Sequence, residues 1–319
     1  MPPARRATAV SDGVQALLRI GRNTADLDRA VAFYRDALGF HVDDANAGRP
    51  AWSRVPGVPA PPSRCARLSV GAQEIELTEF TDAAPYPSGS TSCDLWFQHC
   101  AIVVSDMDEA WARAIQHGAE PITRDGPQIL PPSTGSVIAF KFRDPDGHPL
   151  ELLHFPAGTG DPCWQSVRGE GPMLGIDHSA ISVGDVARSI RFYERLGLHI
   201  AARGVNRGVE QQRLDDLANV DVDVIALQAP TRTPHVELLG YRRPRGRGNA
   251  STDITSVAAD RLEFSMQNLH AARDNLRALD ATIRAQGSSD RANDSQAVLL
   301  RDPDGHCVVL TPYGNREQR

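Results

Sequence analysis

The sequence is almost devoid of lysine and has no long apolar run. Lys141 is the single lysine among 319 residues, so a Schiff-base mechanism has one candidate, which we expect at the surface. No stretch approaches the roughly 18 apolar residues that a membrane span requires. Arginine and lysine number 34 against 40 acidic residues, for a net charge of −6. Since proteins that bind nucleic-acid phosphates are usually basic, we expect neither a nucleic-acid nor a membrane partner.

Cysteine is also sparse, and the motifs of several enzyme classes are missing. The five cysteines, at positions 65, 93, 100, 163 and 307, are scattered and form no Cys-x-x-Cys pair. This pattern argues against a disulfide scaffold or a zinc–thiolate site and predicts a reducing compartment, the cytoplasm. Residues 1–13 lack the apolar core of a signal peptide, and we expect a disordered lead-in. Neither a Gly-x-Ser-x-Gly nor a Walker motif occurs.

The chain does contain an internal repeat. After a short strand pattern, Asp26 is a good helix N-cap, and apolar residues then recur at helical spacing up to Leu38. Gly39 suits the end of this helix. Residues 185–198 repeat the segment with the same spacing from the capping Asp to a Phe-Tyr pair. The first and third units of the chain are therefore alike.

A second kind of unit alternates with the first. It begins at His99, continues with a helix predicted over residues 106–118, and ends with an Asp-Pro-Asp-Gly-His turn at residues 144–148. The fourth unit has a first strand at 261–264, a helix at 268–279 and the same turn at 302–306. The simplest history is duplication of a two-unit ancestor. We therefore expect two halves, residues 15–155 and 175–313, joined by a Pro/Gly-rich linker at 156–174.

These units resemble the vicinal oxygen chelate superfamily, which includes glyoxalase I, extradiol dioxygenases, epimerases and fosfomycin- or bleomycin-resistance proteins. The resemblance rests on the βαβββ order, the Phe-Tyr helix followed by Leu-Gly, and the Asp-Pro-Asp-Gly-His turn before a final strand. It implies an α+β fold in which four βαβββ units pair into two open, cupped mixed β-sheets with helices outside. It also implies a metal inside a cup, with ligands from the first and last strands of the paired units.

The implied ligand positions differ between the four units. The first-strand position holds Arg19, His99, His178 and Arg261, and the last-strand position holds Glu76, Glu151, Glu237 and Val309. If units two and three pair, one cup receives both His residues and both neighbouring Glu residues. Pairing in chain order instead gives Glu76, His99 and Glu151 in one cup, and His178 and Glu237 in the other. We favour the two–three pairing because it collects every complete ligand pair, although the duplication history favours the other.

Structural readings compete with ligation. A lone His at a strand entry is usually structural, and a lone Glu on a strand often faces solvent. Burying a carboxylate is costly unless it is paired or metal-bound, and the recurrence of His and Glu at matched positions favours ligands. We interpret His148 and His306 as turn residues. His235 shares the strand face of Glu237 and could support the predicted ligands, whereas His41, His117, His199 and His270 are expected at the surface.

Imidazole and carboxylate ligands together suit one divalent ion of Fe, Mn, Ni, Co or Zn. The resemblance implies a small-molecule substrate with two adjacent oxygens, and a glyoxalase I-like isomerase or lyase in which Glu151 or Glu237 acts as general base. The alternative is an Fe(II) extradiol dioxygenase using His99, His178 and Glu237. A third hypothesis is a non-catalytic protein that sequesters a drug or metabolite, with Trp52, Trp96 and Trp164 as candidates to line the cup.

Three variable loops, at residues 44–63, 126–136 and 203–223, are expected to set substrate specificity. A homodimer is compatible with the sequence.

Overall fold

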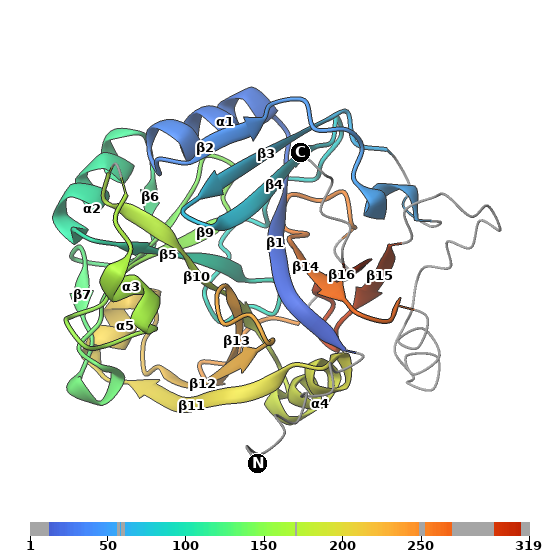
Figure 1. Cartoon of the computed structure of the whole chain (residues 1–319). Coiled ribbons are helices and arrows are strands. Elements are labelled where there is room, and N and C mark those ends of the chain that lie inside the picture. Colours follow the sequence, from blue (N-terminus) through green and yellow to red (C-terminus); the bar gives the residue numbers. More distant parts are fainter. Residues whose placement is uncertain are drawn as a thin grey trace, which may run out of the picture.

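The computed structural model describes residues 13–55, 58, 61–169, 171–248, 253–269 and 297–313, and these residues form two open mixed sheets (Figure 1). Sheet A contains, in spatial order, β15 (Val298–Arg301), β16 (Cys307–Pro312), β14 (Arg261–Met266), β1 (Val14–Thr24), β4 (Gln73–Glu79), β3 (Arg64–Val70) and β2 (His41–Asp44). Sheet B contains β11 (His199–Arg207), β12 (Asp221–Gln228), β13 (His235–Arg243), β10 (Met173–Ser182), β5 (Gln98–Val104), β9 (Pro149–His154), β8 (Ile138–Arg143) and β6 (Glu120–Pro121), and β7 (Gln128–Ile129) pairs with β8.

Each sheet pairs the first strands of two units. Units two and three are neighbours in the sequence, but units one and four are not. In sheet A, β1 of unit one pairs antiparallel with β14 of unit four. In sheet B, β5 of unit two pairs antiparallel with β10 of unit three. The two–three pairing is therefore confirmed, and the chain-order pairing does not form. The predicted fold of two open mixed sheets is confirmed as well.

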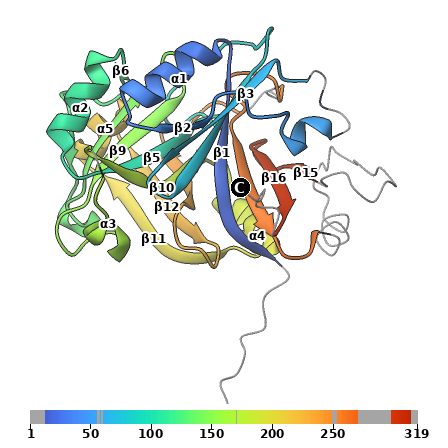
Figure 2. The ribbon, with the colours of Figure 1, turned by 45° about the horizontal axis from the view of Figure 1, so that its top comes forward.

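The helices begin where the capping residues predict. α1 (Leu27–Asp36), α2 (Met107–Gln116) and α4 (Val186–Leu196) each follow an Asp whose side chain accepts a hydrogen bond from the third residue of the helix. Gly197 ends α4 with a left-handed φ of 106°, a conformation that favours glycine. All three helices lie at the periphery of the molecule (Figures 1 and 2). The helix predicted at 268–279 lies, from residue 270 onward, outside the described residues.

The two largest apolar cores lie mainly within the halves of the sequence, although the sheets do not, and Val14 and Leu17 of unit one join the second core. Ile20 of unit one packs in the same core as Ile102 of unit two and the apolar faces of α1 and α2. A second core joins Ile181 of unit three to Phe264 of unit four. Because side chains alternate between the faces of a strand, residues such as His99 and Ala101 lie on the opposite, concave face of sheet B. Each half thus shares a core, while each concave face is built from both halves.

The Asp-Pro-Asp-Gly-His turns connect each even unit to the unit before it. His148 Nε2 lies 2.7 Å from the backbone oxygen of Asn23, and the Tyr34 hydroxyl donates to Asp144 at 3.1 Å. These contacts explain why the turn and the Phe-Tyr helix recur together, and they agree with His148 and His306 as turn residues. The fourth and third units repeat them with His306 and Ser182 at 3.0 Å, and with Tyr193 and Asp302 at 3.2 Å.

Two sequence predictions were wrong. Lys141 is not at the surface: it lies on β8 with only 3% of its area exposed, because a buried carboxylate pairs with it. The segment 203–223 is not a loop, since it holds the end of β11, helix α5 (Val209–Asp215) and the start of β12. Short elements also occur in the linker, as α3 (Pro162–Ser166), and in the other two loops, as η1 (Ala51–Arg54), β7 and η2 (Pro132–Thr134).

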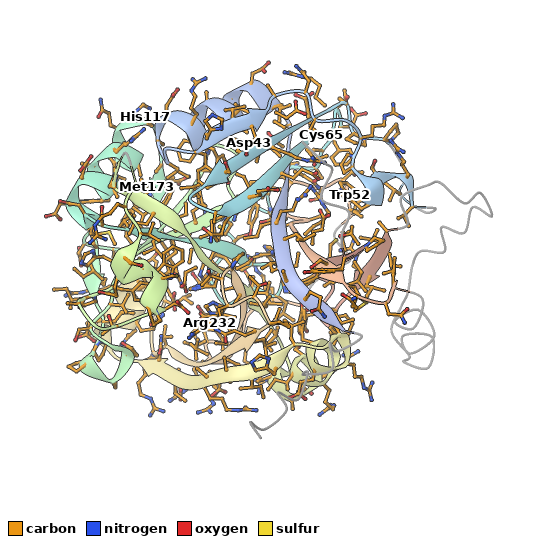
Figure 3. The ribbon with its side chains drawn as sticks, viewed as in Figure 1. Asp43, Trp52, Cys65, His117, Met173 and Arg232 are labelled. Atoms are coloured by element: carbon orange, nitrogen blue, oxygen red, sulfur yellow. The ribbon has the colours of Figure 1, made fainter. Side chains whose placement is uncertain are left out.

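Three of the histidines expected at the surface are exposed. His117 is exposed and lies at the rim of the molecule (Figure 3), and His41 and His199 are exposed too. His270 and the lead-in up to residue 12 lie outside the described residues. Among the described residues, no helix is both long and apolar enough to cross a membrane.

Candidate functional site

Four strands of sheet B bring the predicted ligands to one concave face. His99 and His178 lie on the central strands β5 and β10, offset by two positions in the antiparallel register. Glu151 on β9 is aligned with Ala101 of β5, and Glu237 on β13 with Ala180 of β10. Because cross-strand neighbours on one face stand about 5 Å apart, this register alone places the four side chains together.

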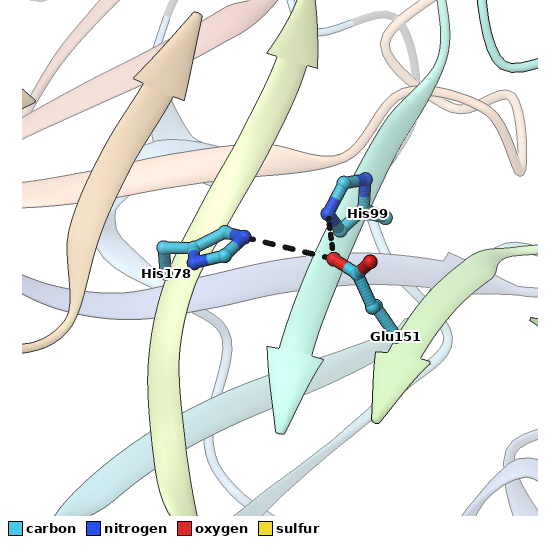
Figure 4. Close-up of side chains that lie close together, drawn as sticks. All are labelled: His99, Glu151 and His178. Carbon is cyan, nitrogen blue, oxygen red and sulfur yellow. Dashed lines mark ion pairs between the residues drawn. The ribbon is translucent and has the colours of Figure 1, made fainter. Parts of the chain in front are cut away.

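The side chains converge at their polar ends (Figure 4). His99 Nε2 lies 2.9 Å from Glu151 Oε2, and His178 Nε2 lies 3.9 Å from the same oxygen. Glu237 approaches from the other side, with its Oε2 3.5 Å from His178 Nε2. The two imidazole rings meet edge to face with centroids 5.6 Å apart. All four residues predicted as ligands therefore belong to one cluster.

Burial and charge set the protonation of this cluster. Burial opposes ionisation of Glu151, but the Lys141 ammonium and His99 lower the pKa of this carboxyl to about 2. His178 and His235 likewise outweigh burial and lower the pKa of Glu237 to about 2. Burial lowers the pKa of His99. Burial opposes charging of His178, but Glu237 and Asp177 outweigh it and raise the pKa of this imidazole to about 9. The cluster thus holds two ionised carboxylates beside the neutral His99, and a proton on His178 or a bound cation balances their charge.

The sequence reading missed the cation beside Glu151. Lys141 is the direct cross-strand partner of Glu151 in the β8–β9 register and faces the same cup. Its Nζ lies 2.7 Å from Oδ1 of Asp215, at the end of α5. Asp215 also accepts hydrogen bonds from Gln211 at 2.8 Å and Tyr241 at 3.0 Å. This buried network ties α5 over the concave face, and no local pattern signals the ion pair because Lys141 and Asp215 are 74 residues apart in the sequence.

A second group of polar side chains contacts His178 on its Nδ1 side. Asp177 Oδ2 lies 2.9 Å from His178 Nδ1, and Trp164 donates its indole N–H to Asp177 Oδ1 at 2.6 Å. His235 stands next to both groups, with Nε2 3.6 Å from Glu237 Oε1 and Nδ1 3.9 Å from Asp177 Oδ2. His235 therefore lies beside both Glu237 and Asp177. Asp177 was missed, although an acidic residue directly before a candidate ligand is a readable signal.

The donors fit a divalent cation. An ion held at about 2.0–2.2 Å by each ligand keeps neighbouring donor atoms roughly 3 to 4 Å apart. The observed donor separations of 2.9, 3.5 and 3.9 Å lie in that range. His178 Nε2 is buried and has no hydrogen-bond partner among the described residues, as a nitrogen awaiting a metal would be. His99, Glu151 and His178 could hold the ion, and Glu237 could complete the set.

The matched cup of sheet A is chemically different. In its register Arg19 stands where His178 does, and Arg261 where His99 does. Glu76 keeps its carboxylate, 3.7 Å from Arg19, but Val309 replaces the second Glu. Arg261 stacks over the buried Trp52 at 4.0 Å. Guanidinium groups therefore supply the positive charge here, so the carboxylate is balanced without a metal.

The three tryptophans proposed to line a ligand cup do not gather in one place. Trp52 belongs to the sheet A cup, where it donates to Glu76 at 3.1 Å. Trp96 donates to Ser90 and lies under Arg247. Only Trp164 stands near the His/Glu cluster, through Asp177. An aromatic-lined binding cup therefore finds no support among these residues.

Comparison with known proteins agrees with this architecture. A family model described as the Glyoxalase/Bleomycin resistance protein/Dioxygenase superfamily matches residues 16–152 and 175–310. A putative lactoylglutathione lyase of Brassica oleracea var. gemmifera is 28% identical over 189 residues, 58% of this chain and 56% of that protein. The lactoylglutathione lyase of Arabidopsis thaliana is 28% identical over 186 residues, 57% of this chain and 55% of that protein. The chain spans about half the length of these curated relatives.

Solved structures share the fold over nearly the whole chain. Glyoxalase I from Zea mays superposes with a TM-score of 0.63 at 20% identity, covering 93% of this chain and 92% of that one. A putative dioxygenase from Bacillus subtilis superposes with a TM-score of 0.58 at 13% identity, covering 95% and 86%. At these identities the likeness concerns the fold alone. Since the family match covers both halves of the sequence, the chain belongs to the Glyoxalase/Bleomycin resistance protein/Dioxygenase superfamily.

Proposed function

We propose that this protein is a divalent-metal-dependent isomerase or lyase of the glyoxalase I type, with one active site in the cup of sheet B. The observation that carries the proposal is the compact buried group of His99, Glu151 and His178, with Glu237 beside His178 at 3.5 Å. In the other cup, Arg19 and Arg261 occupy the matched imidazole positions. Two imidazoles and two carboxylates would hold the ion, which would polarise two adjacent substrate oxygens as a Lewis acid.

The two carboxylates differ in a way that assigns their roles. Glu151 is nearly buried, lies 2.9 Å from His99 and is the strand partner of Lys141, so we assign it as a fixed ligand. Glu237 is 20% exposed, and its contacts with His178 and His235 are longer, at 3.5 and 3.6 Å. We therefore assign Glu237 as the general base. A carboxylate that swings to the substrate can take a proton from a carbon next to a carbonyl.

The same carboxyl can complete the reaction. If Glu237 returns the proton to the adjacent carbon, the net result is an isomerisation in which hydrogen moves and no atom is gained or lost. The ionised state of Glu237 suits it to accept the proton first. Lys141 and its partner Asp215 stay in place, because their role is to hold Glu151 and α5 rather than to exchange protons.

The substrate class follows from the cup and from the relatives. A chelated substrate needs oxygens on neighbouring carbons, and lactoylglutathione, named in both curated relatives, is a 2-hydroxyacyl thioester of that kind. We propose a 2-hydroxyacyl thioester as product and a small 2-oxoaldehyde–thiol adduct as substrate. All five cysteines are unpaired, which supports a reducing compartment such as the cytoplasm.

A second candidate is an Fe(II) ring-cleaving dioxygenase. It is favoured by the tight group of two His and one carboxylate, His99, His178 and Glu151, which is the ligand set of many iron oxygenases. In that case His235, which stands beside Glu237, would act on the substrate as acid or base. The sequence prediction had Glu237 as the carboxylate of this set, whereas the compact group contains Glu151.

Metal content and two assays test these functions. We expect one ion per chain by elemental analysis, lost in His99→Ala and in His178→Ala. Glu237→Gln should retain the ion yet lose at least about 100-fold in isomerisation of a 2-oxoaldehyde–thiol adduct. The control Glu74→Gln, at a half-exposed carboxylate of sheet A, should match the parent protein.

Oxygen consumption with catechols would support the dioxygenase. A parent protein that binds none of Fe, Mn, Ni, Co or Zn after anaerobic reconstitution would exclude both enzymes.

A further inference from the structure

Two buried side chains, Asp177 and Trp164, support His178 on its Nδ1 side. Its Nδ1 lies 2.9 Å from Asp177 Oδ2, and the other carboxylate oxygen, Oδ1, accepts the indole N–H of Trp164 at 2.6 Å. Trp164, Asp177 and His178 are exposed by only 6%, 6% and 5%. Trp164 belongs to α3 in the linker between the halves of the sequence, so this series of contacts begins outside both repeated segments.

We propose that Trp164 and Asp177 are positioning residues for the metal site, through which the linker sets the orientation and metal affinity of His178. This inference rests on the proposed metal site. A carboxylate on one imidazole nitrogen keeps the proton there and leaves the other nitrogen free to bind a metal. Here Asp177 accepts from Nδ1, and Nε2, which faces Glu151 and Glu237, is the nitrogen left to bind an ion.

The indole prevents the carboxylate from turning away. Because each oxygen of Asp177 has its own donor, rotation of the carboxylate would break one hydrogen bond in a buried place, where an unmet polar group is costly. The ring of Trp164 is itself fixed by packing against Val103 and Leu174. A Cβ added at Gly175 would lie 2.8 Å from the indole, so the glycine provides the space for this approach.

The partner ligand His99 has no such support. Gln98 occupies the position before His99 as Asp177 does before His178, but its amide donates to Ser179 Oγ at 3.1 Å instead. His99 Nδ1 is buried and lacks a hydrogen-bond partner among the described residues. The two imidazoles are therefore unequal, and His178 is the one whose tautomer and direction the protein controls.

The test uses Co²⁺ alone as probe on the full chain, with affinity from a titration and the ligand-field absorption spectrum as readouts. Trp164→Phe keeps the aromatic packing and removes only the N–H, and Asp177→Asn removes the charge. We expect Asp177→Asn to weaken Co²⁺ binding about 10- to 100-fold, and Trp164→Phe roughly 3- to 10-fold. Both should alter the absorption spectrum, because the imidazole bound to the ion changes direction.

The matched control is Trp111→Phe, since Trp111 of α2 packs on Phe140 of β8 and its indole N–H has no partner among the described residues. It should leave the affinity and spectrum unchanged. Thermal unfolding of each metal-free variant separates a loss of folding from a loss of positioning. Parent-like affinity and spectrum in both Trp164→Phe and Asp177→Asn would overturn the inference while leaving the metal site intact. Absence of Co²⁺ binding by the parent protein would instead remove the proposed function.

Discussion

Replacement of Lys141 by Met probes the buried ion pair that closes α5 over the sheet B cup. Met keeps the length and most of the packing of the side chain but removes its charge. Lys141 and Asp215 are 3% and 1% exposed, with Nζ and Oδ1 2.7 Å apart. Gln211 and Tyr241 still donate to Asp215, yet they cannot neutralise it.

The expected loss is large because a charge would remain buried without its partner. Breaking a buried ion pair from one side costs about 3–5 kcal/mol, against a total stability of about 5–15 kcal/mol for a typical domain. We therefore expect the free energy of unfolding in urea to fall by about 3–5 kcal/mol in Lys141→Met. Adding Asp215→Asn should recover roughly 1–3 kcal/mol of this loss, because the amide keeps an acceptor for Tyr241 and removes the stranded charge.

An exposed pair provides the control. Arg64 and Asp28 are bonded at 2.7 and 2.9 Å, but both are open to solvent. Arg64→Met should change stability far less than Lys141→Met, because water replaces the lost partner. A loss below about 1 kcal/mol in Lys141→Met, or a double variant no more stable than the single one, would refute the stated role of this pair.

Two further perturbations test the framework. Burial opposes charging of His148, but Asp260 at 3.1 Å raises the pKa of this imidazole in the folded protein. The ion pair therefore contributes fully to stability below the pKa of the unfolded state, near 6.5, and the contribution is lost as the pH rises through the higher pKa of the folded state. Urea unfolding between pH 5 and 9 should show this decline, and His148→Gln should flatten it. Asp106→Ala removes the N-cap of α2 and should lower the free energy of unfolding by about 1 kcal/mol, whereas Ala at the exposed Asp82 should not. Equal changes in both Ala variants would contradict the capping role.

Local features of this protein were readable from its sequence because they depend on neighbouring residues. Asp26, Asp106 and Asp185 cap helices through a backbone N–H three residues away, so spacing alone identifies them. The repeat also defines matched positions, and His99 and His178 stand out because the other two units carry Arg there. The residue types of the His/Glu cluster were therefore predictable before its geometry.

Tertiary structure decided which of these side chains come together. The edges of four similar units can pair in more than one way, and the choice of β5 with β10 depends on contacts between both halves. Lys141 and Asp215 are 74 residues apart, and only the placement of α5 over sheet B shows that the single lysine is buried. Such pairs depend on burial and long-range contact, which no local pattern encodes. The sequence by itself determined which side chains could hold a metal, and the packing determined which of them meet and what supports them.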